Sequence, residues 1–566
     1  MSTQSSTTTS STTAASNKAA SSNATIASDQ PAQESLRVHP ADNVRVALRD
    51  LPQGHRIDEG ADTLTLVEAI RHKHKFALED LAVGDTVTMY GVTVGRATRA
   101  IARGSVIRTD NLEHFTHSDT PVTRREHWQA PDVSAFEDHT FDGFHRPDGG
   151  VGTANLWLVV PLVFCENRNI EVLRQCVADA LGDDPFRDYK RMARQMLHGD
   201  SPSHVTEPPS SPFPNVDGVR FLTHTLGCGG TDDDAQALCN LLAGYITHPN
   251  VAGATVLSLG CQKAQIAMLK QAVASKDPQG LRPVHYLEQQ ASTSEDALIE
   301  QALGTIFDGL REANQVTRQP APLSALRIGV ECGGSDGFSG LSANPVVGGV
   351  IDRLVALGGS GILSEFPELC GVEHELLSRC VDDATAERFS SLMQAYQRHA
   401  DAVGASFSMN PSPGNIRDGL ITDAMKSAGA AKKGGDSPVV EVLDYTETAT
   451  RPGLALLCSP GNDVESTTAL VGSGANLVIF TTGLGTPTGN PVAPTLKVAS
   501  NSDLARRMAD IIDFDSGAVI RGEASIDELA DDLLALCIET ASGRYTTRAV
   551  GLAQHDFIPW KRGVSL

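Results

Sequence analysis

The chain has 566 residues, which is more than one hydrophobic core can organise, so we expect about two to four domains. Hydrophobic residues at 40% and charged residues at 20% are typical of a soluble globular protein, while the net charge of -23 argues against a nucleic-acid-binding surface. No apolar run approaches the roughly 18 residues of a membrane-spanning helix. Ten cysteines without a signal peptide indicate free thiols in a cytoplasmic protein.

The first 115 residues divide into two parts by composition. Residues 1–36 are rich in Ser, Thr, Ala, Asn and Gln, which predicts a disordered tail; a transit peptide is the alternative, but no arginine precedes Arg37. Residues 37–115 contain short alternating apolar runs separated by glycines, which predicts a small β domain. The polar residues 116–145 are expected to form a linker.

From residue 146 onward, short apolar strands alternate with helical patterns, which predicts an α/β region built on parallel strands. We divide it into a first lobe, residues 146–400, and a C-terminal lobe, residues 401–566. Arg168 follows an early strand at the predicted start of a helix, where it can hold an anion. An ordinary capping turn with a surface arginine explains the same residues equally well.

Three cysteines follow predicted strands at comparable positions: Cys228, Cys261 and Cys332. Cysteines at equivalent edges of one α/β sheet can converge on an iron–sulfur cluster or on a single Fe²⁺ completed by His or carboxylate ligands. The alternative is that they are small apolar residues filling tight turns. The spacing alone does not decide between these readings, because no CxxC motif is present.

The segment from Gly329 to His374 is dense in glycine and reactive side chains. Residues just past the carboxyl ends of parallel strands line ligand crevices, so we predict a functional site there. Its candidate acid–base residues are Glu365, Glu368 and His374, to which we add two histidines near other strands, His224 and His248. Solvated acids in two ordinary strand-to-helix turns are the alternative.

A second set of polar residues is predicted to anchor the carboxylate and hydroxyls of a small molecule. A glycine loop follows the strand at residues 477–480; it lacks the ending of a P-loop, so we interpret it as a nest for a carboxylate or hydroxyls. The candidate anchors are Arg168, Ser335, Asp336, Asn344, Thr481, Thr482, Gly483 and Lys497.

Several motifs, in the same chain order, resemble the altronate/galactarate dehydratase family. They include CGGSDGFSGLSANP, SEFPELCGVEH, HTLGCGG, HPN and NPSPGN, and the resemblance runs from about Val38 to the C-terminus. It implies a β-clip (SAF-type) N-terminal domain, a Rossmann-like α/β region and iron as cofactor. The chain departs from the family pattern at Arg108 and Asp110, which replace two histidines, at Ala154, where many members carry Arg, and at Gln262, which replaces an acid.

The resemblance implies β-elimination of water from a sugar acid to give a 2-keto-3-deoxy acid. We predict D-altronate as the substrate and 2-dehydro-3-deoxy-D-gluconate as the product, with iron held by the three cysteines named above. A galactarate dehydratase and a sulfolactate-type lyase are the enzymatic alternatives, and a non-catalytic sugar-acid-binding protein is the alternative of another class. The sequence leaves the oligomeric state open, with a homodimer as one alternative.

Overall fold

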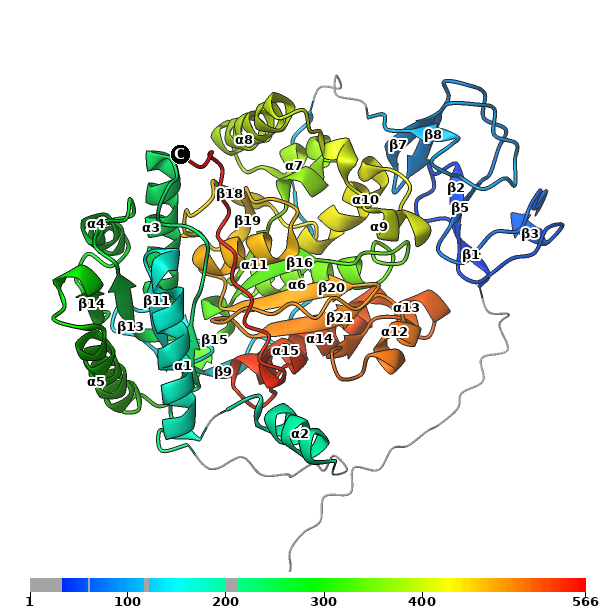
Figure 1. Ribbon diagram of the computed structural model, residues 1–566. Helices are drawn as coiled ribbons and strands as arrows, with labels where there is room; N and C mark the ends of the chain where they lie inside the picture. The colour runs from blue at the N-terminus through cyan, green and yellow to red at the C-terminus, as the bar shows by residue number, and fades with distance from the viewer. Residues whose placement is uncertain (1–32, 60–61, 117–121, 126, 183, 200–210) are drawn as a thin grey trace, which may run out of the picture. The chain divides into compact units, whose positions relative to one another are not determined.

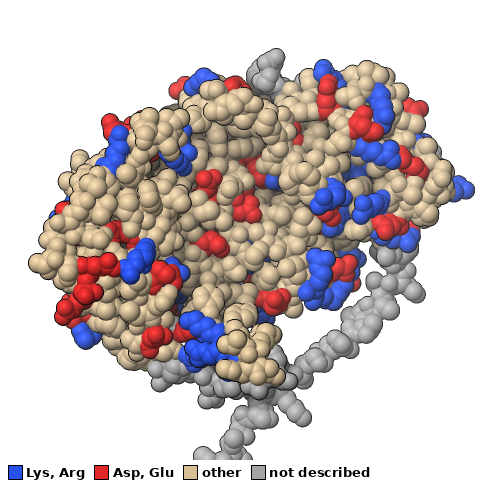
Figure 2. Space-filling model, in the orientation of Figure 1, with Lys and Arg blue, Asp and Glu red and all other residues tan. Residues whose placement is uncertain are grey.

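The computed structural model describes residues 33–59, 62–116, 122–125, 127–182, 184–199 and 211–566 (Figure 1). Residues 1–32 of the predicted tail lie outside the described residues. None of the described helices is long and apolar enough to cross a membrane. On the face drawn in Figure 2, acidic and basic side chains are interspersed.

The N-terminal region is built of short antiparallel strands, as the alternating pattern predicts. One sheet consists of β1 (Ser35–Leu36), β2 (Val44–Ala47) and β5 (Lys75–Ala77); a second consists of β6 (Thr86–Met89), β7 (Val92–Ala97) and β8 (Leu112–Glu113); β3 (Arg56–Glu59) pairs with β4 (Asp62–Thr65). The β6–β7 hairpin turns at Tyr90 and Gly91, which both have positive φ, as a two-residue turn between twisted strands requires.

A four-stranded parallel sheet forms the first part of the α/β region. Its strand order is β12 (Gly218–Phe221), β11 (Leu156–Pro161), β13 (Val251–Ser258) and β14 (Val284–Glu288). Helices α1 (Asn167–Leu181) and α5 (Glu295–Ala313) cover one face, and α3 (Asp232–Ile246) and α4 (Ile266–Lys276) cover the other. The sheet is therefore buried on both faces, which explains why β11 is apolar along its whole length.

A seven-stranded parallel sheet forms the second part. Its order is β18 (Val439–Leu443), β19 (Gly453–Leu457), β17 (Ser360–Leu363), β16 (Arg327–Cys332), β20 (Leu477–Thr482), β21 (Thr495–Ala499) and β22 (Phe514–Asp515). Helices α6 (Ala343–Ala356) and α14 (Ile526–Ala541) pack on one face and α11 (Asp463–Gly472) on the other (Figure 1). The strand order reverses between β16 and β20, and such a switch point is where open α/β sheets bind ligands.

The two parallel sheets share one hydrophobic layer. Residues of both sheets pack there against α3 and α11, which lie against each other. The helices approach closely where Gly244 meets Gly472: a Cβ added at Gly244 would lie 2.2 Å from the carbonyl oxygen of Gly472. Two glycines at this crossing let the helices, and thus the two sheets, pack directly.

The remaining elements complete the chain. Strands β9 (Thr140–His145), β10 (Val151–Gly152) and β15 (Gln319–Pro322) form a small antiparallel sheet. The other helices are α2 (Arg187–His198), α7 (Glu373–Arg379), α8 (Asp383–Ala402), α9 (Pro413–Arg417), α10 (Asp423–Ala430), α12 (Ser502–Arg507), α13 (Ala518–Arg521) and α15 (Arg548–Gly551).

The fold class is as predicted: a small N-terminal β region precedes a large α/β region with a parallel sheet. Three predicted boundaries differ from the structure. The tail predicted to be disordered over residues 1–36 contains β1 (Ser35–Leu36), which pairs with β2. The predicted linker 116–145 contains β9, which pairs with β15. The boundary between residues 400 and 401 falls inside the seven-stranded sheet, because β16 and β17 from the predicted first lobe pair with later strands.

Candidate active site

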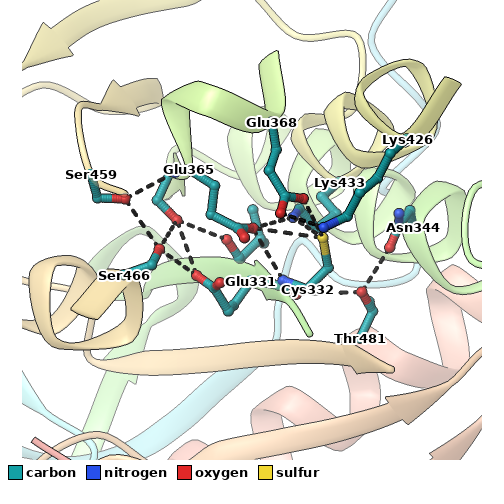
Figure 3. Close-up of polar contacts among 12 residues, drawn as sticks. Glu331, Cys332, Asn344, Glu365, Glu368, Lys426, Lys433, Ser459, Ser466 and Thr481 are labelled. Carbon is teal, nitrogen blue, oxygen red and sulfur yellow. Dashed lines mark hydrogen bonds and ion pairs between the residues drawn. The ribbon is translucent and has the colours of Figure 1, made fainter. Parts of the chain in front are cut away.

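The carboxyl ends of two adjacent strands bring a thiol and two carboxylates together. Cys332 is the last residue of β16, while Glu365 and Glu368 follow β17, Glu368 lying in a 3-10 turn (Phe366–Leu369). One ligand atom from each lies within 4.8 Å of the others, and all three side chains are buried. Because β16 and β17 are neighbouring parallel strands, the segment between them returns its polar residues to the same edge (Figure 3).

Two lysines from a distant segment neutralise this group. Lys433 Nζ lies 2.8 Å from the sulfur of Cys332 and 2.6 Å from Glu365 Oε2. Lys426, on α10, places its Nζ 2.5 Å from Glu368 Oε1, which also accepts a hydrogen bond from Asn410 at 2.9 Å. We call Cys332, Glu365, Glu368, Lys426 and Lys433 the thiol–lysine cluster.

The electrostatics of the cluster separate its members into charged and neutral groups. Burial and the neighbouring Glu365 raise the pKa of Cys332 well above its usual value, so the thiol stays protonated. Burial alone would raise the pKa of Glu368, but Lys426 and Lys433 hold it below its usual value. Burial alone would lower the pKa of Lys433, whereas Cys332 and Glu365 raise it well above the ordinary range. Buried groups with such opposed shifts are typical of catalytic sites.

Glu331 provides a second buried carboxyl group one residue before Cys332. Burial, and then the charge of Glu365, raises the pKa of Glu331 well above its usual value, so it is a neutral acid. Its Oε2 accepts hydrogen bonds from Ser466 at 2.6 Å and Ser364 at 3.2 Å, while its Oε1 has no partner in the described structure. Figure 3 shows this serine-lined group beside the thiol–lysine cluster, with Glu365 between them.

The backbone at Glu365 is in the left-handed region, with φ of 65°. A non-glycine residue rarely adopts this conformation, and such strain concentrates at functional sites. The conformation is held by its surroundings, because the Glu365 N–H donates to Ser459 Oγ at 3.0 Å and its carboxylate pairs with Lys433. The fold thus fixes the direction in which this carboxylate points.

Of the two lysines in the cluster, Lys426 is the more exposed to solvent. The Lys433 side chain is 1% exposed, whereas that of Lys426 is 10% exposed and Asp463 beside it is partly buried. A Cβ at Gly333 would lie 1.9 Å from Asp463 Oδ2, so this glycine lets the carboxylate approach the backbone next to Cys332. Burial, and then Glu365 and Glu368, raises the pKa of Asp463 to about 6.

Several predicted anchors lie around the ends of β16 and β20. Asn344 Oδ1 accepts a hydrogen bond from Thr481 at 2.7 Å, and the Gly483 N–H donates to the Gly334 carbonyl at 3.0 Å. Ser335 is buried, and its hydroxyl has no partner in the described structure, which leaves it available to a ligand. Thr482 Oγ1 accepts backbone N–H groups of its own loop and so shapes the turn.

Asp336 and Lys497 are buried near this loop but engage different partners. Asp336 accepts hydrogen bonds from Ser500 and Asn501 and pairs with Lys73 of the N-terminal region at 2.9 Å. Lys497 Nζ has no hydrogen-bond partner among the described residues and lies 3.2 Å from the centre of the Phe480 ring. Burial lowers the pKa of Lys497 to about 7, against the opposing effect of acids that include Asp463.

Other predicted residues lie outside the thiol–lysine cluster. His224 and His248 are buried, and both nitrogens of each ring are in hydrogen bonds to the backbone: Nε2 with the carbonyls of Pro161 and Ala475, Nδ1 with the N–H groups of Leu226 and Asn250. Burial lowers their pKa to about 4 and about 3, so the rings are neutral. This geometry favours a structural role for both over the predicted acid–base role.

Arg168 and His374 are exposed. Arg168 pairs with Glu295 of α5 instead of facing the cluster, and His374 lies in the first turn of α7. Arg108 and Asp110, which replace the family's histidines, pair with Glu68 and Arg99 rather than with each other. Gln262, at the position of the family's acid, is buried and hydrogen-bonded to Ser258 and to the backbone of Gly260.

The three predicted metal-binding cysteines do not converge. Cys332 belongs to the seven-stranded sheet, whereas Cys228 and Cys261 follow strands of the four-stranded sheet and are exposed. Both sheets are parallel and all three cysteines follow strands, so the local sequence pattern could not assign them to different sheets.

Lys426, Lys433, Glu331 and Asp463 were not predicted from the sequence. Lys426 lies on α10 and Lys433 in the 3-10 turn that follows it (Ala431–Gly434), in a stretch whose sequence resembles a Gly/Lys/Ala-rich connector. Their pairings with Glu368 and Glu365 span 58 and 68 residues. Glu331 was overlooked because it lies inside the apolar strand β16. An ionisable residue within such a strand was the available signal, since buried carboxyl groups are rarely without function.

A second group of potential metal ligands joins the N-terminal β region to α10. His114, Cys370 and Asp423 have ligand atoms within 4.8 Å of one another, and His114 Nδ1 lies 2.5 Å from Asp423 Oδ1. The short ion pair raises the pKa of His114. This charge pairing accounts for the arrangement without an ion.

The fold and the thiol–lysine cluster define an α/β enzyme with a buried acid–base site at the carboxyl ends of β16 and β17, beside the switch point of a parallel sheet. Three family models match successive parts of the chain: the altronate/galactarate dehydratase SAF domain at residues 33–115, the second domain of D-galactarate dehydratase/altronate hydrolase at 143–314, and the D-galactarate/altronate dehydratase C-terminal domain at 323–565. The chain belongs to the altronate/galactarate dehydratase family, a family of hydro-lyases.

Curated relatives match nearly the whole chain. Altronate dehydratase of Escherichia coli (strain K12) is 34% identical over 512 residues, 90% of this chain and 96% of the relative. Altronate dehydratase of Bacillus subtilis (strain 168) is 33% identical over 534 residues, 94% and 99% of the two chains. Galactarate dehydratase (L-threo-forming) of E. coli is 32% identical over 536 residues, 93% and 96%. The predictions of family, fold class and hydro-lyase activity are therefore confirmed.

Proposed function

We propose that this protein dehydrates a sugar acid, with D-altronate as substrate and 2-dehydro-3-deoxy-D-gluconate as product. The thiol–lysine cluster at the carboxyl ends of β16 and β17 in the seven-stranded sheet is the observation that carries the proposal. Galactarate is the second candidate, because similarity to the altronate and galactarate enzymes differs by only one or two percentage points. The substrate in either case is a small anionic polyol, which suits buried ammonium groups.

The reaction requires a base, a stabiliser of negative charge and an acid. A base removes the proton next to the carboxylate, the 3-hydroxyl accepts a proton from the acid and leaves as water, and the resulting enol tautomerises to a 2-keto-3-deoxy acid. Glu368 suits the role of base, since Lys426 and Lys433 keep it ionised without solvent. The ammonium of Lys426, on the side nearest solvent, suits the negative charge that develops on the substrate carboxylate.

The iron predicted from the resemblance does not fit the thiol–lysine cluster. Cys332, Glu365 and Glu368 form a donor set of suitable composition, but the Lys433 ammonium lies within 2.8 Å of the sulfur and of Glu365 Oε2. A cation between these atoms would have to displace a buried, charged lysine. The reaction steps assigned to Glu368 and Lys426 therefore involve no metal at this position.

The test compares Glu368→Gln with Glu387→Gln, which changes an exposed glutamate on α8. Anaerobically purified, iron-supplemented enzyme is assayed for keto-acid formation with D-altronate, galactarate, sulfolactate and related acids. Loss of the base predicts a fall in kcat of at least about 100-fold for Glu368→Gln and no change for the control. If Glu368→Gln turns over substrate within about twofold of the unmodified chain, Glu368 is not the base. If the unmodified chain binds one of the acids but does not turn it over, the protein is a sugar-acid-binding protein and not a dehydratase.

A cytoplasmic location and a homodimer stay predictions. Size-exclusion chromatography with light scattering measures the assembly directly, and cell fractionation measures the location.

A further inference from the structure

Three cysteines leave one edge of the four-stranded sheet together. Cys165 lies in a 3-10 turn (Phe164–Glu166) after β11, Cys228 follows β12, and Cys261 follows β13. These strands are adjacent and parallel, with β11 in the centre, so their carboxyl ends lie at the same edge. The edge therefore receives one thiol from each of three consecutive strands of the sheet.

Backbone hydrogen bonds hold the three segments against one another. The Phe164 N–H donates to the Leu226 carbonyl at 3.0 Å, and the N–H of Lys263 donates to the Gly227 carbonyl at 3.0 Å. Gly227 has φ of 98°, and a Cβ there would lie 2.3 Å from the Leu162 carbonyl oxygen. Only glycine permits this approach, which brings the segment of Cys228 beside that of Cys165.

The three thiols are close enough to interact electrostatically, and they are not used elsewhere in the fold. Burial, and then the neighbouring Cys228 and Cys261, raise the pKa of Cys165. All three are free and exposed, whereas Cys239 and Cys537 are buried in hydrophobic cores as small apolar residues. Cys261 Sγ accepts a hydrogen bond from Gln290 at 3.3 Å. The alternative interpretation, that these cysteines are small apolar residues filling tight turns, therefore does not account for their exposure.

Unpartnered polar atoms lie beside Cys165. Glu166 is completely buried, and its Oε1 has no hydrogen-bond partner in the described structure. Asn167 Oδ1 is likewise buried without a partner, although its amide donates to the His224 carbonyl at 2.8 Å. Buried polar atoms without partners are rare in native folds and point to a missing ligand.

The separation of the sulfur atoms distinguishes a cluster from a single ion. Sulfur ligands about 2.3 Å from one tetrahedral ion lie within roughly 4 Å of one another. Among the described residues, the groups with ligand atoms all within 4.8 Å of one another do not include these three cysteines. A site wider than a single ion, lined by soft thiolate donors, suits an iron–sulfur cluster.

We propose that Cys165, Cys228 and Cys261 bind a [4Fe–4S] cluster through three thiolates. The inference rests on the proposed dehydratase function, for which it names the iron-binding residues in place of Cys332. Three protein ligands leave one iron of such a cluster without a cysteine, and the Lewis acidity of that iron is the chemistry the group would supply for the loss of a hydroxyl.

The experiment measures the cluster independently of activity. The full chain is purified anaerobically, reconstituted with Fe²⁺ and sulfide, and analysed for iron, acid-labile sulfide, visible absorption and electron paramagnetic resonance after reduction. About four irons and about four sulfides per chain are expected. Cys165→Ser, Cys228→Ser and Cys261→Ser should each lower cluster content at least about fivefold, with thermal midpoints of the apo chains unchanged because the side chains are exposed.

Cys176→Ser is the matched control. Cys176 is also free and exposed, but it lies within α1 and not after a strand of the sheet. It should retain the full cluster. Iron without sulfide, no iron after reconstitution, or a cluster that survives all three variants would overturn the proposal. A cluster present in a chain that turns over none of the acids would uphold the site and refute the proposed function, so the two failures are distinguishable.

Discussion

Lys433 acquires its chemistry from burial among groups of opposite charge. In water a lysine ammonium beside a carboxylate contributes little, but the interior strengthens the interaction and penalises any unpaired charge. Glu365 and Glu368 share two ammonium groups, and Cys332 and Glu331 stay neutral beside them. At neutral pH this distribution keeps Glu368 ionised and Glu331 protonated. A dehydration needs both forms at the same time, one as base and the other as acid.

His248 gives a prediction of stability against pH. Its pKa in the fold is about 3, below the ordinary value of 6.5, because burial disfavours the charged ring. As the pH decreases, His248 is therefore protonated in the unfolded chain before it is protonated in the folded protein. Its contribution to the free energy of unfolding is fully present above pH 6.5 and is lost as the pH falls towards 3. The contribution is about 1.4 kcal/mol per pH unit.

The measurement is urea unfolding at several pH values between 4 and 7 for the unmodified chain and two variants. His248→Gln should be less stable at pH 7 but should show a shallower decline, and His399→Gln, at an exposed position of α8, should match the unmodified chain. An unchanged slope in His248→Gln would show that the ring does not titrate in a buried environment.

At the scale of elements, glycines decide how closely helices approach sheets. Helix α5 contains two: a Cβ at Gly304 would meet nothing within 4 Å, whereas a Cβ at Gly309 would lie 2.2 Å from the Trp157 ring of β11. Gly304→Ala should therefore stabilise the protein by about 0.5–1 kcal/mol through helix propensity. Gly309→Ala should destabilise it by about 1–3 kcal/mol through overpacking.

Thermal unfolding of the two variants provides the comparison, with each serving as the control for the other because the substitution and the helix are the same. Equal effects of the two substitutions would contradict the packing of α5 on β11.

At the scale of the whole molecule, the N-terminal β region contributes to the α/β region directly. Lys73 pairs with the fully buried Asp336 at 2.9 Å, and Lys75 donates to the Gly419 carbonyl at 2.6 Å. Lys73→Met leaves Asp336 as a buried charge without its ammonium, so we expect a loss of about 3–5 kcal/mol in the free energy of unfolding. Activity should fall as well, because Asp336 holds the loop that follows Cys332.

Arg99→Met is the control for this change. Arg99 also forms an ion pair in the N-terminal region, with Asp110, but both side chains are more than half exposed. Its loss should change stability by less than about 0.5 kcal/mol. Chemical denaturation and initial rates measure both variants, and equal stability of the two would show that the Lys73 contact does not hold the regions together.

The sequence by itself determined the fold class, the glycine turns and one half of the active site. Short apolar strands alternating with helices require parallel sheets, and β16 and β17 are consecutive neighbours in one sheet, so Cys332, Glu365 and Glu368 were brought together by local order alone. The family followed from motifs in these turns and in three other segments of the chain.

Only the tertiary structure decided which distant segments meet. Lys426 and Lys433 reach the site from a connector that carries no strand signal, and β11, β12 and β13 form a sheet separate from β16. Cys165 therefore joins Cys228 and Cys261, while Cys332 faces lysines. The physical reason is that periodicity specifies which face of a strand is buried, whereas the neighbour of each strand is set by packing over the whole chain.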